Sequence, residues 1–306
     1  MIYKMTDKDM EILFERISKD FQSFGSKEEN GDIVFGDIQR FSDISEEKSS
    51  YPPKDFLIER SENILSIPRA EKRAVFGVKS CDLRGFYIMD KQILGKDPFY
   101  TVKRENTMFI NFVCEKMCSG GFCTSFGGPV LDEYDVQVLH KNGYFYVEAS
   151  DKYEKYLFGF SESDDQNVFE EHKKEFESLY GRLNVDGIEN RMKWSSNLWN
   201  KFANYCISCG ACNYSCPTCY CVDVYDDDDG RKKEWDSCIL EGFTRTAAGN
   251  VRPELSERLR QRFYHKFKYY KLSRGAYLCT GCNRCVDDCP VDIDIKEVIT
   301  HDYDRE

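Results

Sequence analysis

Residues 206–217 read CISCGACNYSCP and residues 279–290 read CTGCNRCVDDCP, so one cysteine pattern occurs twice in the chain. In each copy three cysteines are separated by two residues, and a fourth follows after three residues and directly precedes a proline. This spacing binds [4Fe-4S] clusters, with the first three thiolates on one cluster and the fourth on the other. Zinc also accepts four thiolates, but it rarely needs two such runs. The pattern predicts two clusters with these ligands: Cys206, Cys209, Cys212 and Cys289 for cluster 1, and Cys279, Cys282, Cys285 and Cys216 for cluster 2.

The composition narrows the class of protein. The chain has 306 residues, with 43 Lys and Arg against 54 Asp and Glu, and its net charge of −11 argues against nucleic-acid binding through a general basic surface. Its 15 cysteines are too few for a small disulfide scaffold, and an odd number cannot all pair within one chain, which favours metal binding. No stretch approaches the roughly 18 apolar residues of a membrane span, and residues 1–10 lack the apolar core of a secretory signal. We therefore expect a soluble, cytoplasmic protein.

The N-terminal part alternates strand and helix patterns. Thr6 can cap a first helix, and Asp82 can cap another that runs to about Leu94. Strand patterns lie at residues 31–38, 73–80 and 107–113. The last two strands and the helix between them form a β-α-β unit, in which both strands run parallel and end at the same edge of the sheet. The sequence thus predicts an α/β domain with a partly parallel sheet over residues 1–190.

Four cysteines gather near this predicted sheet edge. Cys81 and Cys114 directly follow two neighbouring strands, and parallel strands are about 4.8 Å apart at the carboxyl edge where α/β proteins place ligands. Cys118 and Cys123 follow in the loop CSGGFC, whose glycines allow it to fold back over that edge. We therefore expect these four cysteines to hold a third [4Fe-4S] cluster. The alternative is that they are reduced structural thiols, because a buried free cysteine packs as a small hydrophobe.

The C-terminal part, residues 191–306, contains both cysteine motifs and is expected to be mainly helical. Residues 217–278 separate the motifs, and much of this segment, especially 254–274, favours helix and lacks strand signals. A hairpin pattern at residues 136–149 and helix patterns at residues 164–180 and 188–204 precede it. Two clusters on such a long helical connection resemble the α-helical ferredoxins, as found in the iron-sulfur subunits of succinate dehydrogenase and heterodisulfide reductase.

Several stretches are similar to a narrower family. They are residues 206–221 (CISCGACNYSCPTCYC), 235–238 (WDSC), 258–266 and 279–285 (CTGCNRC), with residues 78–82 (VKSCD) and the group Cys114, Cys118 and Cys123 in the N-terminal part. These stretches resemble the β subunit of cytoplasmic sulfhydrogenases and the related iron-sulfur subunit of anaerobic sulfite reductases. The resemblance implies an electron-transfer subunit of an anaerobic multisubunit oxidoreductase. It also implies partners: a flavin-containing, nucleotide-oxidising subunit or a ferredoxin on one side, and a catalytic subunit such as a hydrogenase or sulfite reductase on the other.

The chain lacks the sequence fingerprint of a dinucleotide site. No GxGxxG occurs, so we expect neither NAD nor FAD to bind here in a Rossmann manner, and a flavin belongs to a partner. The chain is accordingly expected to relay single electrons without catalytic residues of its own.

Cys219, Cys221 and Cys238 are left without an assignment. They could hold a further cluster with a different fourth ligand, support a redox thiol, or compete with Cys216 for cluster 2; as buried thiols they could also simply pack around the clusters. An alternative function follows from the first two options, namely a catalytic thiol or heterodisulfide reductase with an open cluster near these residues. A regulatory iron-sulfur sensor is a third function, although sensing normally needs only one cluster.

A basic segment is the last candidate feature. Residues 258–274 contain seven Lys or Arg and no acid, with aromatic residues interleaved. This pattern is typical of a solvated helix face, but the cations could also moderate the negative charge of nearby clusters. A third interpretation is that Arg258, Arg262, Lys266 and Lys268 dock an acidic partner subunit.

Overall fold

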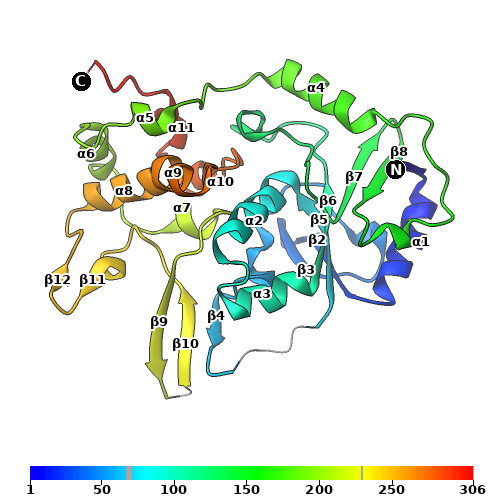
Figure 1. Cartoon of the computed structure of the whole chain (residues 1–306), viewed down its shortest axis with the longest axis horizontal. Helices are drawn as coiled ribbons and strands as arrows, with labels where there is room; N and C mark the ends of the chain where they lie inside the picture. The colour runs from blue at the N-terminus through cyan, green and yellow to red at the C-terminus, as the bar shows by residue number, and fades with distance from the viewer. Residues whose placement is uncertain (67–70, 229, 306) are drawn as a thin grey trace.

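The N-terminal part of the computed structural model, which describes residues 1–66, 71–228 and 230–305, is built on a mixed sheet (Figure 1). Its strand order is β1-β8-β7-β6-β5-β2-β3. Strands β2, β5, β6 and β7 run parallel, whereas β1, β8 and β3 are antiparallel to their neighbours. The strands are β1 (Tyr3–Met5), β2 (Gln22–Glu29), β3 (Asp32–Asp37), β5 (Arg73–Lys79), β6 (Thr107–Phe112), β7 (Val136–Lys141) and β8 (Tyr144–Ala149). The prediction of an N-terminal mixed sheet with parallel strands is confirmed.

Helices cover both faces of this sheet because side chains alternate along the strands. On β5, Phe76 packs in one core with Phe14 of α1 (Asp7–Ser18), and Val75 packs in the opposite core with Phe86 of α2 (Ser80–Ile93). Helix α3 (Pro98–Glu105) contributes Tyr100 to the second core. The two faces are therefore buried separately, and the carboxyl edge of the parallel strands stays available.

The β-α-β unit forms as predicted, with β5 and β6 parallel and adjacent. One detail of the prediction is wrong: α2 begins at Ser80, with Lys79 as its N-cap residue in an extended conformation. Strand and helix follow each other without a loop, so Cys81 and Asp82 both lie in the first helical turn. The prediction that Thr6 caps α1 is confirmed, since Thr6 and Asp9 form a capping box.

The C-terminal part is rich in helices, as predicted. Trp199 and Phe263 stack at the centre of its core, which also includes Ile188 and Val298. Its helices are α6 (Leu198–Ala203), α7 (Ala211–Tyr214), α8 (Leu255–Tyr264), α9 (Tyr270–Arg274), α10 (Arg284–Asp287) and α11 (Ile295–Thr300), and α4 (Val168–Tyr180) and α5 (Ile188–Arg191) precede them. A π-helical turn over His265–Tyr269 joins α8 to α9 without interruption. The helix expected over 188–204 is broken between α5 and α6, where the Ser196 hydroxyl accepts a hydrogen bond from the Leu198 N–H and starts a new helix.

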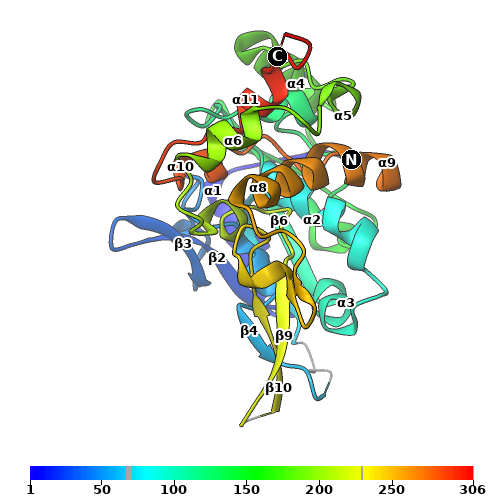
Figure 2. The same ribbon diagram turned by 90° about the vertical axis from the view of Figure 1, so that its left-hand side faces the viewer.

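The segment between the cysteine motifs contains strands as well as helices, although much of it was expected to favour helix and to lack strand signals. Strands β9 (Val222–Asp227) and β10 (Gly230–Trp235) form an antiparallel hairpin that extends away from the body of the protein (Figure 2). Strand β4 (Ser61–Asn63) of the N-terminal part pairs with β10. Two short strands, β11 (Arg245–Thr246) and β12 (Gly249–Asn250), follow. Because charged residues fill most of the hairpin, its sequence shows little of the alternation that predicts a strand. The hairpin is supported instead by the pairing of β10 with the distant strand β4.

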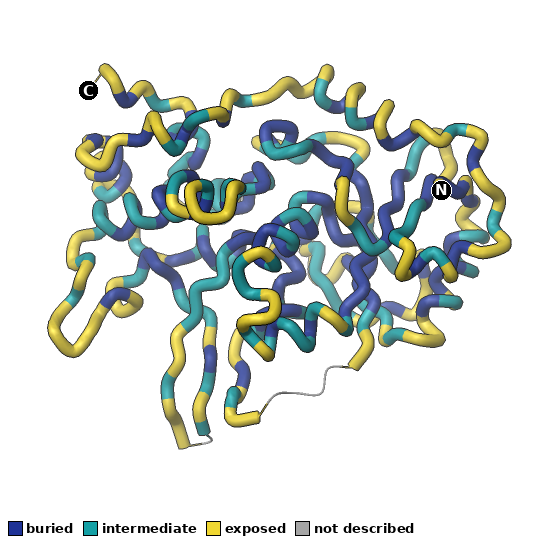
Figure 3. The backbone as a smooth tube through the Cα atoms, in the orientation of Figure 1, coloured by how far each residue is buried: buried dark blue, intermediate teal, exposed yellow. Residues whose placement is uncertain are grey.

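Burial follows this architecture, with the sheet and the centre of the helical part buried and the hairpin tip exposed (Figure 3). None of the helices in the described part of the chain is long and apolar enough to span a membrane.

Candidate metal centres

The two cysteine motifs fold into the same backbone shape. In the first, Ser208 and Gly210 have φ angles of 58° and 75°; in the second, the equivalent Gly281 and Asn283 have 68° and 66°. Each pair of left-handed residues turns the chain tightly between cysteines, and a short helix, α7 or α10, follows in each copy. The repeated sequence therefore produces two similar thiol-presenting loops.

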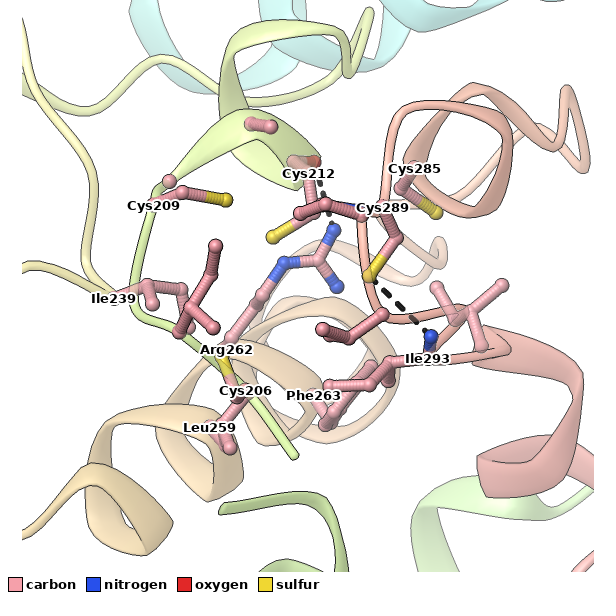
Figure 4. A pocket seen from close by; sticks show the side chains of 16 residues that line it. Cys206, Cys209, Cys212, Ile239, Leu259, Arg262, Phe263, Cys285, Cys289 and Ile293 are labelled. Atoms are coloured by element: carbon pink, nitrogen blue, oxygen red, sulfur yellow. Dashed lines mark hydrogen bonds between the residues drawn. The ribbon is translucent and has the colours of Figure 1, made fainter. Parts of the chain in front are cut away.

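The first group of thiols surrounds one cavity (Figure 4). Cys206, Cys209 and Cys212 of the first motif line it together with Cys289 of the second, and Cys285 also reaches it. Backbone N–H groups of Ser208 and Ile293 donate hydrogen bonds to the sulfurs of Cys206 and Cys289, at 3.4 and 3.3 Å. Such N–H···S bonds stabilise thiolate ligands. Arg262 also lines the cavity, and apolar side chains form most of the remaining wall, among them Ile207, Ile239, Leu259, Phe263 and Ile293.

The second group is centred on the buried thiol of Cys216. Burial is the main cause of the raised pKa values of Cys279, Cys282 and Cys285. Cys216 is one of the neighbours that add to each of these shifts. Cys216 is only 7% exposed and comes from the first motif, whereas the other three come from the second. The structure thus brings the fourth cysteine of one motif next to the first three of the other.

The N-terminal group lies at the carboxyl edge of the sheet. Cys81 lies in the first turn of α2, and Cys114 follows β6. Burial raises the pKa of Cys123 to about 12, and the neighbouring Cys114 and Cys118 contribute to that shift. Burial and then the Asp82 carboxylate raise the pKa of Cys81, and the neighbouring Cys114 adds to this shift. All four cysteines are therefore neighbours, and Cys114 and Cys118 line an open cavity of about 690 Å³.

This N-terminal group interlocks with the second motif. Phe122 donates its backbone N–H to the Gly281 carbonyl at 2.9 Å, and a Cβ on Gly281 would lie 2.5 Å from the Phe122 oxygen. Arg284, between Cys282 and Cys285, forms a buried ion pair with Asp82 of α2. Cys282 is also one of the charged neighbours of Cys81. The second group therefore lies between the other two.

Cys219, Cys221 and Cys238 open on a separate cavity of about 340 Å³, which His265 and Lys266 also line. Cys219 is hydrogen-bonded to Cys216, and Cys221 to Cys238. Cys219 is therefore a neighbour of the second group. Cys238 is a charged neighbour of Cys212, so it adjoins the first group.

Three of the seven cations of the basic segment face inward, which overturns the docking interpretation for three of its four candidate residues. Arg258, Arg262 and Lys266 are 6%, 3% and 3% exposed. Arg258 donates to the Ile239 carbonyl and Arg262 to the Cys212 carbonyl, both at 2.9 Å. Arg262 and Lys266 lie beside cysteine thiols, and none of the three buried cations is accessible to a partner. Burial alone lowers the pKa of Lys266, but the charges of Cys216 and Cys219 outweigh it and raise that pKa.

Three further buried polar groups give no clear signal in the sequence. Lys54, 3% exposed, donates to the carbonyls of Asn213, Cys216 and Cys219 at 3.2–3.3 Å. The sequence pattern indicates Asp82 only as a helix cap, whereas it pairs with Arg284 from the opposite end of the chain. A charged residue inside a buried motif, such as Arg284 in CNRC, is the signal that could have suggested a buried partner.

The spacing of the sulfur atoms tests what these groups can bind. Among the described residues, the one trio of Cys, His, Asp or Glu side chains with ligand atoms mutually within 4.8 Å is Glu46, Glu115 and His140. A single zinc ion holds thiolates at about 2.3 Å, which would bring its sulfurs closer together than that. No three cysteine sulfurs that the structure describes are therefore spaced as ligands of a single zinc ion would be.

Comparisons with known proteins agree with this chemistry. Residues 205–293 match the family model of the 4Fe-4S dicluster domain. The chain is 29% identical to sulfhydrogenase 2 subunit beta of Pyrococcus furiosus over 94% of its own length and 93% of that protein. It is also 29% identical to the F420-dependent formate dehydrogenase subunit beta of Methanocaldococcus jannaschii, over 33% of its own length and 20% of that protein. The chain is thus an iron-sulfur protein related to the beta subunits of multisubunit oxidoreductases, as its motifs and their resemblance to the sulfhydrogenase beta subunits predicted.

Proposed function

We propose that this protein relays single electrons through three [4Fe-4S] clusters, one on each of the three groups of four cysteines. An iron-sulfur cluster, when bound, gains and loses single electrons at a potential set by its ligands and surroundings. The observation that carries the proposal is the order of the groups. The second group adjoins the N-terminal group through Cys81 and Cys282, and it shares its two motifs with the first group.

The ends of this series differ in a way that suits two partners. Cys209 of the first group is exposed, and Tyr205 and Ile207 beside it are 63% and 62% exposed. At the other end, Cys114 and Cys118 line the open cavity of about 690 Å³. The first group therefore has an exposed thiol and the N-terminal group lines an open cavity, whereas Cys216 of the second group is buried, which suits a relay between an electron donor and an acceptor.

The relatives suggest the kind of partners. Sulfhydrogenase and formate dehydrogenase are named as multisubunit enzymes, so we infer a catalytic subunit on one side and a flavin-containing subunit or a ferredoxin on the other. We further propose that residues 1–190 and 191–306 are the two domains, that neither flavin nor NAD binds here, and that the complex is cytoplasmic.

Iron analysis tests the relay. Protein purified without oxygen should contain about twelve iron atoms and as many acid-labile sulfides per chain, at four per cluster. The double variant Cys81→Ala/Cys118→Ala should retain about eight and keep the remaining reduced-state EPR signals. A content near eight in the unmodified protein would remove the N-terminal cluster, and stoichiometric zinc would overturn the whole proposal. Further subunits should co-purify with this protein, and any flavin should be bound to those subunits.

A catalytic thiol or heterodisulfide reductase is the second candidate. The cavity of about 340 Å³ beside Cys219, Cys221 and Cys238 favours it, because a relay needs no such opening. A vacant iron coordination position near these thiols would support catalysis, whereas all-cysteine ligation supports the relay.

A further inference from the structure

Cys221 and Cys238 come together at the base of the β9–β10 hairpin. Cys221 directly precedes β9, and Cys238 follows β10 by three residues. The strand pairing continues beyond the hairpin, since Asp236 donates its N–H to the Cys221 carbonyl at 3.0 Å. The sulfur of Cys221 is hydrogen-bonded both to the Cys238 thiol and to the Cys238 backbone N–H. The hairpin therefore brings the two thiols side by side on the cavity that both line.

A fixed amide orients the second thiol of this pair. Asn213 is 1% exposed, and its Oδ1 accepts a hydrogen bond from Arg262 Nε at 2.8 Å. This bond directs the amide Nδ2 toward Cys238, to whose sulfur it donates at 3.1 Å. Cys238 is 8% exposed, so this hydrogen bond from the Asn213 amide lies inside the protein.

The pairing distinguishes these two thiols from the third cysteine of the cavity. Cys219 is a neighbour of Cys216, which we assign to the second cluster, whereas Cys221 and Cys238 are neighbours of each other. A zinc ion would need a third ligand within reach, and no trio of described side chains that includes these cysteines is that close. Neighbouring thiols can join in a disulfide, whose S–S bond is about 2.0 Å long.

We propose that Cys221 and Cys238 form a redox-active dithiol/disulfide pair. In the oxidised form a bond joins the two sulfurs; two electrons and two protons break it and leave one thiol on each residue. The electrons come singly from low-potential iron-sulfur donors, which in this chain are the clusters proposed above, so the assignment of the donor rests on the proposed function. Protons reach Cys221 through the cavity of about 340 Å³ that it lines.

The location suits an exchange between one-electron and two-electron chemistry. Cys238 adjoins Cys212 of the first group, and Cys219, on the same cavity, adjoins Cys216 of the second. The pair therefore lies beside both groups while contributing to neither.

Differential alkylation tests the pair directly. The full-length protein, purified without oxygen, is oxidised with thionine or reduced with dithionite, then denatured with a chelator and one alkylating reagent. After chemical reduction, a second reagent labels only the cysteines that were in disulfides. Cys221 and Cys238 should carry the second label in the oxidised sample and the first label in the reduced one, whereas the cluster cysteines carry the first label in both. Free Cys221 and Cys238 in the oxidised sample would overturn the proposal.

Electron counting separates this proposal from the relay. The wild-type protein should take up two more electrons per chain than Cys221→Ser or Cys238→Ser, at unchanged iron content. Val222→Ala is the matched control, because Val222 lines the same cavity and carries no thiol, and it should take up as many electrons as the wild type. Loss of about four irons in Cys221→Ser would instead indicate a fourth cluster and overturn the pair. Low iron in the wild type together with a labelled disulfide would overturn the relay and leave the pair standing.

Discussion

Lys266 donates a hydrogen bond from its ammonium group to the sulfur of Cys216 at 3.1 Å. The same ammonium donates to the Thr218 hydroxyl at 3.2 Å and to the Leu278 carbonyl at 2.9 Å, so its three protons are all used. It lies in the π-helical turn His265–Tyr269, and such turns are frequent at functional sites. A buried positive charge is therefore fixed beside a cysteine that we assign to the second cluster.

Replacement of Lys266 by Met should lower the reduction potential of that cluster. Reduction adds a negative charge, which the ammonium stabilises, so its loss disfavours the reduced state. For a one-electron couple, a loss of about 1.4 kcal/mol corresponds to roughly 60 mV. An EPR-monitored redox titration measures the shift. Lys268→Met is the matched control, because Lys268 lies near the Tyr264 ring instead of a thiol. An unchanged reduction potential of the second cluster, at native iron content, would mean that Lys266 has only a structural role.

The crossed arrangement of the fourth cysteines leads to a second prediction. Cys289 lines the cavity of Cys206, Cys209 and Cys212, although it belongs to the other motif. We expect Cys289→Ser to alter the EPR signal of the first cluster and to leave the second largely intact. Cys216→Ser should do the reverse. If Cys289→Ser altered only the signal that depends on Cys279 and Cys282, the ligands would follow the motifs instead of crossing between them.

The fold could be predicted best where the pattern is local. The β-α-β unit of β5, α2 and β6 follows from periodicity, as does the convergence of Cys81 and Cys114 at one sheet edge. The hairpin β9–β10 could not be predicted, because β10 also depends on β4, more than 160 residues earlier in the chain.

The electrostatics of the candidate site also depend on contacts between distant parts of the chain, so they could not be predicted from the local sequence. The cysteine spacing indicates which thiols meet, but it does not indicate that Lys266 and Arg262 face them. The pattern of residues 258–274 is typical of a solvated helix face, as is usual for charged residues. The cations are buried because thiolates occupy the neighbouring loops, which is a tertiary interaction without a local signal.

Glycine at position 281 permits the contact between the N-terminal group and the second motif. A Cβ there would meet the Phe122 oxygen at 2.5 Å and Cys123 Cα at 2.7 Å, and the φ of +68° would be strained for other residues. We expect Gly281→Ala to reduce iron content by about one or two clusters and to lower the thermal midpoint. Gly275→Ala is the control: its φ is +77°, but no heavy atom lies within 4 Å of the added Cβ, so only the backbone strain remains. Equal effects of both variants would mean that the contact contributes nothing.

His265 makes the stability of the protein depend on pH. Burial and the neighbouring Lys266 lower the pKa of His265 to about 4, from an ordinary value near 6.5. Below pH 6.5 the unfolded chain takes up this proton while the folded protein does not, so the free energy of unfolding falls as the pH drops toward 4. The slope from one such group is at most about 1.4 kcal/mol per pH unit. Urea unfolding between pH 7 and 5 should show a shallower decline for His265→Gln, and identical slopes would contradict the buried, neutral state.

The ion pair between Arg284 and Asp82 provides the last prediction. Both side chains are essentially inaccessible, at 1% and 0% exposed, and Arg284 also donates to the Ser49 carbonyl at 3.1 Å. Arg284→Met leaves the Asp82 carboxylate buried without its partner, and breaking a buried pair in this way typically costs about 3–5 kcal/mol. The double variant Arg284→Met/Asp82→Leu should recover much of this loss, because an apolar pair of similar volume avoids the uncompensated charge. Thermal unfolding of the three proteins, with iron content measured on each, tests the effect. A single variant as stable as the wild type would show that Asp82 finds another partner or is protonated, and that the pair does not hold the N-terminal sheet against the second motif.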